Sequence, residues 1–461
     1  MNKPPSMFVS KFSISQALAL LAVSLVQAQT LTWDALTGTT GVQNGSGTWN
    51  LSNSNWWNGA SNVSWVNGAE AIAQFGTPTP VSANTVSVDQ DILLKELRFL
   101  GVTTVTIASG QQYSLNGNVA GRVIDFGTNG LIQMADFSSG GSQFVSLGAN
   151  LSLKGTHLRV QKFGEGTAFQ FLTLGMATNA QLAGDFTIGG SIYVTVNNPN
   201  TLQAVDRIVV EAGGSAALGG ANADYAQPFH LAGFGNSLGF TGTAYGAIRF
   251  TTANTRISGP VTLTADAGVH TNSSGANGLS GMVISGAISD GGAGHAFHRF
   301  ALGRGNGTLT LSGVNTYGGT TVLGRAQAGY SGGITVLDFS AANAPQNDIL
   351  YHGLAMPGAL ELIGGNSASV LRLIGRDGQT HGQQLGDVAV SGTHSALELQ
   401  AGAGGALCLT AGALSRSGTA TLTVNGPVAG AFTTTQADGF LGPWLSYQTA
   451  AGERSWGRVQ G

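Results

Sequence analysis

The sequence predicts an all-β chain that folds as a stacked β-solenoid, and composition, turn residues and a recurring strand pattern support this. Of 461 residues, 72 are glycine, 42% are hydrophobic and 9% are charged. The glycine content is about twice the average, yet the hydrophobic content excludes a disordered chain, which would be poor in apolar residues. Outside the N-terminus no segment carries the 3.6-residue apolar stripe of an amphipathic helix. Only residues 91–100 have a charged composition that allows a short helix.

The clearest unit of the pattern is the run 306–324, NGTLTLSGVNTYGGTTVLG, which reads as two short strands joined by Asn and Gly turn residues. With a period of two, apolar side chains face one side of a strand and hydroxyl side chains face the other. The apolar set is Leu309, Leu311 and Val322; the hydroxyl set is Thr308, Thr310 and Ser312. One coil of this kind cannot bury its apolar face alone, so similar coils must lie above and below it.

Looser copies of the pattern recur about a dozen residues apart, the spacing of short strands separated by turns. They lie at residues 247–248, 261–263, 282–284, 334–336, 360–362, 388–390, 397–399, 407–409 and 421–424. Gly-Gly, Asn-Gly, Gly-Asn and Ser-Gly pairs between them supply the positive φ angles of tight turns. Two or three strands are expected to make one rung of roughly 20–30 residues. Asn306, Asn315 and the Thr320–Thr321 pair are expected to hydrogen-bond from rung to rung.

Charge and cysteine content exclude several functions and bonds for this chain. The 19 basic and 22 acidic residues give a net charge of −3 and neither sign is clustered, so nucleic-acid binding is not expected. Cys408 is the only cysteine, which excludes an intramolecular disulfide. Its place between Leu407 and Leu409 puts it on the outward side of a strand or at a rung junction. A catalytic thiol would need a nearby base, and none is close in sequence.

The N-terminus reads as an export signal. Lys3 and Lys11 provide the positive region, residues 14–26 the apolar region, and cleavage is expected after Ala28. The apolar region is short for a membrane span, although an uncleaved anchor is the alternative.

The following segment, residues 29–80, is rich in tryptophan, and five of the seven tryptophans lie there. They are Trp33, Trp49, Trp56, Trp57 and Trp65. We favour an N-terminal cap, in which bulky residues cover the open end of the solenoid. The alternative is a sugar-binding platform of exposed aromatic faces.

Residues 284–324, with ISGAISDGG followed after an interval by GNGTLTLSGVNTYGGTTVLG, resemble the autotransporter-associated β-strand repeat of bacterial surface proteins. The N-terminal TWD, GTWN, NWWNG and AIAQFG motifs resemble the start of secreted proteins that carry this repeat. Residues 384–388 and the closing GFLGPW of residues 439–444 are similar to the C-terminal part of such passengers. Between Asp290 and Gly305 the usual short link is replaced by a longer segment, which we expect to be an inserted loop.

The resemblance implies a right-handed parallel β-helix passenger that is secreted or displayed on the outer cell surface, with a structural or adhesive role. It brings no catalytic residue, cofactor or metal ligand. Its implied partners are cell-surface glycans or other surface components, together with outer-membrane export machinery or a barrel not present in this chain. The expected organisation is a signal peptide at 1–28, a cap at 29–80, a solenoid at 81–440 with its strongest repeat at 284–324, and a tail at 441–461.

The runner-up hypothesis is an extracellular polysaccharide-binding or polysaccharide-degrading β-helix protein, which as an enzyme would need paired carboxylates or calcium. Asp89 and Asp91 are the only close acidic pair and would share one face of a strand. The basic and acidic residues at 95–98 favour a solvated charged edge instead.

Histidine and glycine motifs give weaker signals. His295 and His298 have a spacing that would ligate zinc on a helix but not on a strand, so we favour the inserted loop. His352 and His381 precede glycine as in some glycosidases, but neither has a neighbouring acidic pair. Residues 303–307 resemble a phosphate-binding loop, yet no helix follows, so we interpret the glycines as turn residues.

Overall fold

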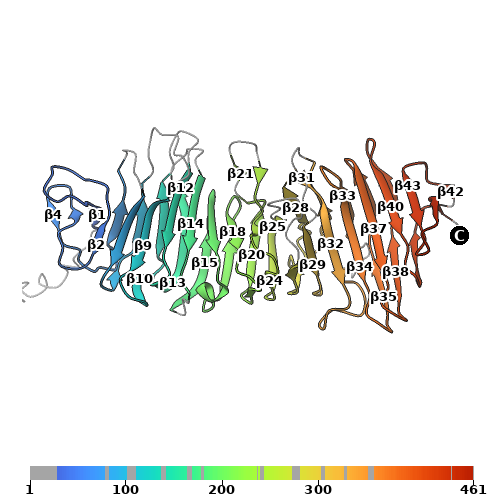
Figure 1. Ribbon diagram of the computed structural model, residues 1–461, viewed down its shortest axis with the longest axis horizontal. Coiled ribbons are helices and arrows are strands. Elements are labelled where there is room, and N and C mark those ends of the chain that lie inside the picture. Colours follow the sequence, from blue (N-terminus) through green and yellow to red (C-terminus); the bar gives the residue numbers. More distant parts are fainter. Residues whose placement is uncertain are drawn as a thin grey trace, which may run out of the picture.

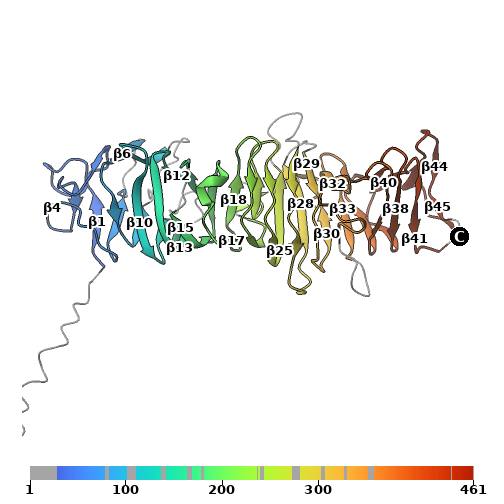
Figure 2. The same ribbon diagram turned by 90° about the horizontal axis from the view of Figure 1, so that it is seen from below.

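The computed structural model describes residues 28–77, 83–100, 111–135, 142–163, 169–177, 181–235, 237–238, 243–271, 281–302, 307–326, 330–350, 358–437 and 439–459. The expected signal peptide, apart from Ala28, lies outside these residues. The described chain is an elongated stack of short strands that follow one another in sequence order along the long axis (Figures 1 and 2). Strands β1 to β4 lie at one end and β42 to β45 at the other. The prediction of an all-β solenoid is confirmed in its coarse form, with long parallel sheets.

Three faces surround the core, and the chain visits them in a fixed order. Face 1 contains β2 (Gly47–Trp49), β6 (Asn84–Val88), β9 (Gln111–Gly117), β12 (Ser142–Leu147), β14 (Phe169–Leu174), β16 (Ile192–Val196), β18 (Ser215–Leu218), β23 (Ile248–Phe250), the end of β25 (Val261–Thr271), β28 (Phe297–Leu302), β30 (Thr321–Leu323), β33 (Leu360–Ile363), β36 (Val388–Ser391) and β39 (Leu414–Arg416). Each is parallel to its neighbours, as β14 is to β16 through the pair Leu172 and Val194.

Face 2 contains β1 (Thr30–Trp33), β5 (Ile72–Phe75), β8 (Glu96–Phe99), β11 (Leu131–Ala135), the end of β13 (Leu151–Phe163), the end of β15 (Leu182–Ile188), β17 (Arg207–Val210), β20 (Phe229–Gly233), the start of β25 and β27 (Ile288–Ser289). The same position in later rungs is taken by β35 (Thr380–Gln384), β38 (Ala406–Ala411) and β41 (Gly430–Thr434). Backbone bonds from Thr316 to Ile288, from Asn315 to Ile349 and from Asp348 to Gly382 connect the two parts of this face.

Face 3 contains β7 (Ile92–Leu93), β10 (Arg122–Thr128), the starts of β13 and β15, β19 (Asp224–Tyr225), β24 (Arg256–Ile257), β26 (Met282–Ile284), β29 (Thr308–Leu311), β32 (Gly333–Asp338), β34 (Ser369–Ile374), β37 (His394–Gln400), β40 (Thr421–Asn425) and β43 (Leu445–Gln448). Because one rung passes over face 3, then face 2, then face 1, strands adjacent in sequence lie on different faces. β29 and β30 therefore do not pair with each other but with strands of the neighbouring rungs.

Antiparallel elements interrupt this scheme mainly at the two ends and on face 1. They are β3 (Trp56–Trp57), β4 (Asn62–Val63), β21 (Ser237–Leu238), β22 (Thr243–Ala244), β31 (Tyr330–Ser331), β42 (Gly439–Phe440), β44 (Arg454–Trp456) and β45 (Arg458–Val459). One 3-10 helix, η1, spans Pro199–Leu202. None of the helices in the described ranges is long and apolar enough to cross a membrane.

Rung length agrees with the predicted range in the regular part of the stack. One rung separates Ser369 from Ser395 on face 3, Thr380 from Ala406 on face 2 and Val388 from Leu414 on face 1. Each step covers 26 residues, the separation that also joins Asp387 to Ala413. The step from Thr321 to Leu360 is longer than the predicted range. Each of the looser copies found in the sequence contains part of a strand.

The alternation predicted for 306–324 holds in β29 and fails in β30. Leu309 and Leu311 are fully buried, whereas Thr308 and Thr310 are half-buried on the outer side. In β30, however, Leu323 joins the core, while Val322 lies opposite Glu361 and lines an outer pocket. The two-residue period determines which side chains point inward within one strand. It does not carry over the segment between Leu311 and Thr321, which crosses face 2, so the expectation for Val322 was wrong. Ser312 is also buried, at the corner that follows β29.

Two further expectations on local structure were wrong. Residues 91–100 form β7 and β8 rather than a helix, because Leu97 and Phe99 are buried in the core and stack on the next rung. The segment between Asp290 and Gly305 is not simply an inserted loop, since β28 occupies Phe297–Leu302. The Phe297 ring is fully buried, so core packing turns this stretch into a strand of face 1.

Parallel stacking extends beyond residues 81–440 at both ends. Within residues 29–80, β1 pairs in parallel with β5 and β5 with β8. Within residues 441–461, β43 pairs in parallel with β40.

The tryptophan-rich segment forms a closely packed cluster. Trp33, Trp49, Trp56 and Trp65 are at most 1% exposed, and Trp57 is half-buried. The Trp56 ring centroid lies 5.4 Å from that of Trp33, 4.9 Å from that of Trp49 and 4.8 Å from that of Trp65. Four of the five rings therefore offer no exposed face, and the alternative of a sugar-binding platform is wrong for them.

Candidate functional site

Carboxylates at the corners of the rungs hold backbone N–H groups of the next rung. Asp91 accepts a hydrogen bond from the Val123 N–H at 3.1 Å, and Asp266 accepts one from the Ala296 N–H at 2.8 Å. The same relation joins Asp377 to Ala403 and Asp387 to Ala413, both at 2.8 Å. A corner cannot continue a strand ladder, so its N–H groups need side-chain acceptors. These acidic residues therefore have a structural use that accounts for their positions.

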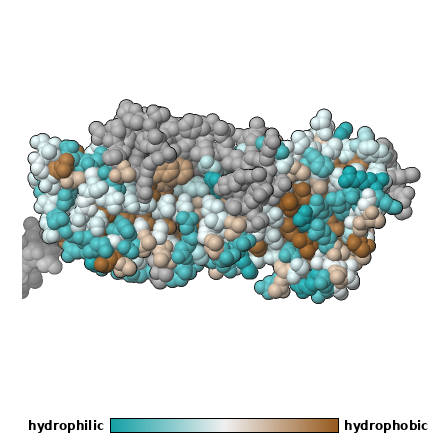
Figure 3. All heavy atoms as spheres, viewed as in Figure 1, coloured by the Kyte–Doolittle hydropathy of each residue, from teal (hydrophilic) through white to brown (hydrophobic). Residues whose placement is uncertain are grey.

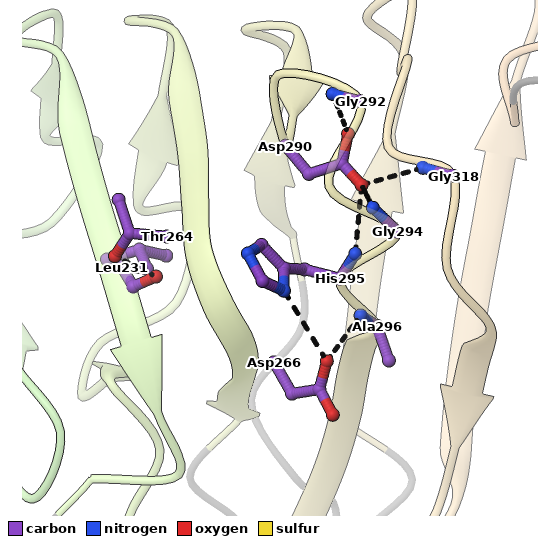
Figure 4. Close-up of polar contacts among 9 residues, drawn as sticks. All are labelled: Leu231, Thr264, Asp266, Asp290, Gly292, Gly294, His295, Ala296 and Gly318. Carbon is purple, nitrogen blue, oxygen red and sulfur yellow. Dashed lines mark hydrogen bonds and ion pairs between the residues drawn. The ribbon is translucent and has the colours of Figure 1, made fainter.

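Asp290 is the most extensively bonded of these carboxylates (Figure 4). It accepts hydrogen bonds from the backbone N–H groups of Gly292 at 2.8 Å, Gly294 at 2.7 Å and His295 at 2.9 Å, all in its own turn. A fourth bond of 3.0 Å comes from Gly318 in the following rung. Burial by itself would raise the pKa of Asp290, but the four N–H donors hold it below its ordinary value. A carboxyl that stays ionised in this way is unsuited to act as a general acid near neutral pH.

Asp89 and Asp91 do not form the pair that the sequence suggested. β6 ends at Val88 and β7 begins at Ile92, so the two carboxylates lie in a corner rather than on one strand. Asp89 accepts a bond of 2.8 Å from the Ser87 hydroxyl, while Asp91 bonds to the next rung and lies 3.8 Å from Arg122 Nη1. No group of three or more potential metal-ligating side chains occurs within the described ranges.

The two histidines near β28 have separate environments. The His295 ring points toward Asp266, with 4.0 Å between Nδ1 and the carboxylate oxygen (Figure 4). His298 packs edge-on against Phe234 with ring centroids 4.7 Å apart. Because β28 begins at Phe297, only His298 lies on the strand, and the two do not form a joint metal site in the described structure.

The remaining candidate residues have structural surroundings or lie outside the described residues. His381 is 1% exposed, stacks on Phe339 at 5.1 Å and has its Nδ1 2.7 Å from the Gln346 carbonyl oxygen. Cys408 is half-buried between the buried Leu407 and Leu409, as expected for an outward position. His352, Asn306 and residues 303–306 lie outside the described residues, and Gly307 offers its carbonyl to Arg299.

The predicted polar ladder is confirmed at Asn315. Its side chain is buried, donates to the Ile349 carbonyl at 2.9 Å and accepts from the Ile288 N–H at 3.0 Å. It thus bridges the rungs on both sides. The Thr321 hydroxyl instead bonds to the Tyr317 hydroxyl of its own rung at 2.7 Å.

On the outer side of face 1 lies an aromatic row that the sequence analysis missed, and several of its rings are buried. Neighbouring ring centroids along it lie between 4.7 and 6.3 Å apart. The row runs through Phe144, Phe171, Tyr193, Tyr245, His270, Phe300 and Tyr330. Phe300 and Tyr330 belong to a small hydrophobic cluster separate from the core, with Phe234 packed against it. Arg325 lies 5.3 Å from the Tyr330 centroid and 5.5 Å from that of Phe300.

This row ends at a surface pocket with a volume of about 270 Å³, which we call the face 1 pocket. Its lining comes from β28, β30, β33 and the segment around Phe234. The residues are Phe234, His298, Phe300, Val322, Gly324, Arg325, Ala326, Glu361 and Ile363. In Figure 3, hydrophobic patches are interspersed with hydrophilic ones over the drawn surface rather than joined in one apolar face. A defined pocket is therefore a better candidate site than the surface at large.

Polar groups of the face 1 pocket are available for a ligand. In the described part of the chain, Arg325, Glu361 and His298 make no side-chain hydrogen bond or ion pair. The pKa of His298 is lowered to about 4, chiefly by burial; the charge of Asp266 acts in the opposite direction and that of Arg325 in the same direction as burial. The imidazole is therefore neutral at pH 7 and offers one N–H donor and one nitrogen acceptor.

Comparison of the chain with protein-family models, curated proteins and solved structures gives no match. Functional conclusions therefore come from the geometry of this chain. No short motif predicts the face 1 pocket, since its lining residues run from Phe234 to Ile363.

Proposed function

We propose that this chain is a secreted or surface-displayed structural protein, an adhesin-like and non-catalytic passenger built on a β-solenoid. The observation that carries the proposal is the use of its corner side chains: Asp91, Asp266, Asp290, Asp377 and Asp387 all hold backbone N–H groups. A long stack stiffened in this way suits a stalk or display element, whose job is to hold a surface at a distance.

In this proposal the solenoid is a right-handed β-helix and residues 29–80 cap its N-terminal end. The support for a cap is the packing of Trp33, Trp49, Trp56 and Trp65 at the end of the stack, with the antiparallel strands β3 and β4 beside β1. Unpaired strand edges at the end of a solenoid would otherwise template association between molecules.

Export through the N-terminal signal is tested by expressing the full chain in a Gram-negative host. We expect a mature protein that begins at Gln29, measured by intact mass, and that is found in the medium or is digested by protease added to intact cells. A matched control replaces Leu20 and Leu21 with Arg, which destroys the apolar region of the signal and should leave an unprocessed protein inside the cell. Equal processing of both proteins, or retention of the unaltered chain in the cytoplasm, would contradict the proposal.

The second candidate is an extracellular polysaccharide-binding or polysaccharide-degrading protein. The face 1 pocket favours binding, whereas the separate roles of Asp89 and Asp91 give no support to cleavage. We expect no release of reducing ends or unsaturated products from a panel of plant, algal and bacterial polysaccharides. If activity were found, its loss in the Asp89→Asn, Asp91→Asn double variant would restore this pair as a catalytic site.

A further inference from the structure

We propose that the face 1 pocket binds one neutral pyranose unit of a glycan, with Phe234 as the apolar contact and Arg325, Glu361 and His298 as hydrogen-bonding groups. This rests on the second candidate function, polysaccharide binding, and deepens it, because it names the kind of sugar unit and the groups that hold it. It is a property of the folded chain and does not depend on export or display.

The apolar part of the pocket suits the face of a sugar ring. Phe234 is half-buried and thus keeps part of its ring exposed, whereas Phe300 is 1% exposed and supports it from the second hydrophobic cluster. Val322 and Ile363 are nearly buried and add aliphatic surface from β30 and β33. A pyranose ring has C–H groups on one face, which pack on aromatic and aliphatic surface as other apolar groups do.

The polar part of the pocket suits hydroxyl groups. Glu361 offers only acceptors, Arg325 offers only donors, and the neutral His298 offers one of each. None of the three has a hydrogen-bonding partner among the described residues, so each can bind a ligand without breaking an existing bond within the protein. Sugar hydroxyls both donate and accept, and they match such a mixed set better than a purely anionic or cationic ligand does.

Charge decides between neutral and acidic sugars. Arg325 and Glu361 carry opposite charges and His298 is neutral at pH 7, so the described lining residues have no net charge. Stacking places the Arg325 guanidinium 5.7 Å from the Phe234 centroid, where it extends the platform as well as donating hydrogen bonds. A uronate carboxylate in the same space would be attracted by Arg325 and repelled by Glu361, so the lining gives no net attraction that offsets the loss of the carboxylate's water. The pocket therefore favours a neutral hexose over a uronic acid.

Pocket size limits the ligand to one ring. Its volume of about 270 Å³ is just below the range of roughly 300–1,000 Å³ found for sites that enclose drug-sized ligands. One sugar with about 12 heavy atoms has room for only a small binding free energy, so affinity for a single unit should be millimolar. A polymer that presents many units to many displayed copies would bind more tightly through avidity.

The experiment uses the mature full chain and measures binding by affinity electrophoresis and by titration calorimetry. The probes are neutral polysaccharides, such as glucans, mannans and galactans, with acidic ones such as polygalacturonate and alginate beside them. We expect retardation by at least one neutral polymer and weaker or no retardation by acidic ones. Binding restricted to the acidic polymers, or to none of the neutral ones, would overturn the proposal.

Two variants test whether the glycan binds in the face 1 pocket. Glu361→Gln removes a charged acceptor and Phe234→Ala removes the platform, and each should raise Kd by about tenfold or more. Matched controls are Glu453→Gln, an exposed carboxylate, and Trp456→Ala, an aromatic side chain that is 61% exposed. Both lie near the C-terminal end of the stack, and Kd should not change in either.

Thermal unfolding and signal processing distinguish a loss of binding from a failure to fold or a failure of export. Glu361→Gln is nearly isosteric at a surface position, so its thermal unfolding curve should match that of the unaltered chain. Unchanged affinity in both pocket variants would overturn the site even if the polymer binds. Loss of glycan binding with normal processing would contradict only this inference, whereas failure of processing with intact binding would contradict only the display function.

Discussion

The Asp290 carboxylate accepts a hydrogen bond of 3.0 Å from the backbone N–H of Gly318, which lies 28 residues later on the neighbouring rung. The same carboxylate also holds three N–H groups of its own turn. One side chain thus fixes the shape of a corner and its distance from the next rung. Because Asp290 is 5% exposed, water has little access to replace these bonds.

Replacing Asp290 with Ala should lower the free energy of unfolding by about 2–4 kcal/mol, because several buried N–H donors lose a charged acceptor together. The free energy of unfolding of Asp290→Asn should lie between those of the unaltered chain and of Asp290→Ala. The amide oxygen still accepts hydrogen bonds, but the NH₂ group faces N–H donors. Denaturant midpoints measure the effect. The control is Asp206→Ala, an exposed carboxylate, which should change the midpoint little. Equal midpoints for Asp290→Ala and the control would show that the corner bonds do not stabilise the stack.

Asn315 provides a second test of bonding between rungs. Asn315→Asp keeps the acceptor for the Ile288 N–H but loses the donor to the Ile349 carbonyl, and Asn315→Ala loses both. For a side chain that is 1% exposed, we expect a loss of about 2–3 kcal/mol for Ala. Hydrogen exchange should show faster opening at Ile288 in the Ala variant and protection closer to normal in the Asp variant. If the protection of the Ile288 N–H were the same in both variants as in the unaltered chain, the bridging role of Asn315 would be contradicted.

The sequence predicted the fold where physical constraints are local. Alternation in β29 and the recurrence of short apolar strands follow from the two-residue period and from the need of each rung for neighbours. The use of glycines with positive φ at turns follows from the same pattern. Val322 was placed on the wrong side because the chain crosses face 2 between Leu311 and Thr321, and the number of residues in that crossing does not determine which side chains of β30 point inward.

Charged and loop-like segments were harder to predict. Residues 91–100 form strands although Lys95, Glu96 and Arg98 are charged, because Glu96 pairs with Arg98 at 2.6 Å and leaves Leu97 and Phe99 to the core. The face 1 pocket was not predictable, since Phe234 and Glu361 come together only through stacking of several rungs. A signal was present in the form of aromatic residues at outward positions, but recognising it requires the register of each strand.

Stability should fall between pH 6.5 and about 4, and His298 should contribute to that fall. Its pKa is about 4 in the folded chain against an ordinary value of 6.5, because burial and Arg325 outweigh the opposing effect of Asp266. As the pH drops below 6.5 the unfolded chain takes up the proton first, so the stability present above pH 6.5 is lost progressively. Each pH unit in this interval lowers the free energy of unfolding by about 1.4 kcal/mol for such a histidine.

His298→Phe removes this contribution and keeps an aromatic ring beside Phe234. Thermal unfolding measured from pH 7 to pH 4.5 should therefore show a shallower loss in the variant. Burial also lowers the pKa of His230, His270 and His394, so some pH dependence should persist. Asp290 affects stability at lower pH than the histidines do. Because its pKa is depressed in the folded chain, its contribution to stability is lost only as the pH falls through the acidic range. Parallel curves for the variant and the unaltered chain would contradict a neutral, buried His298.

Trp56 tests both the core and the proposed cap at the N-terminal end. Its ring contacts Trp33, Trp49, Trp65 and Phe75, with the last centroid 5.4 Å away. Trp56→Ala should cost about 3–5 kcal/mol through lost burial and a cavity, whereas Trp57→Ala, at a half-buried site on the same strand, should cost less. If the cluster covers strand edges, Trp56→Ala should also form oligomers at high concentration, because open edges pair with other molecules. Light scattering combined with gel filtration measures this. A destabilised but strictly monomeric variant would retain the packing role of Trp56 and contradict the cap.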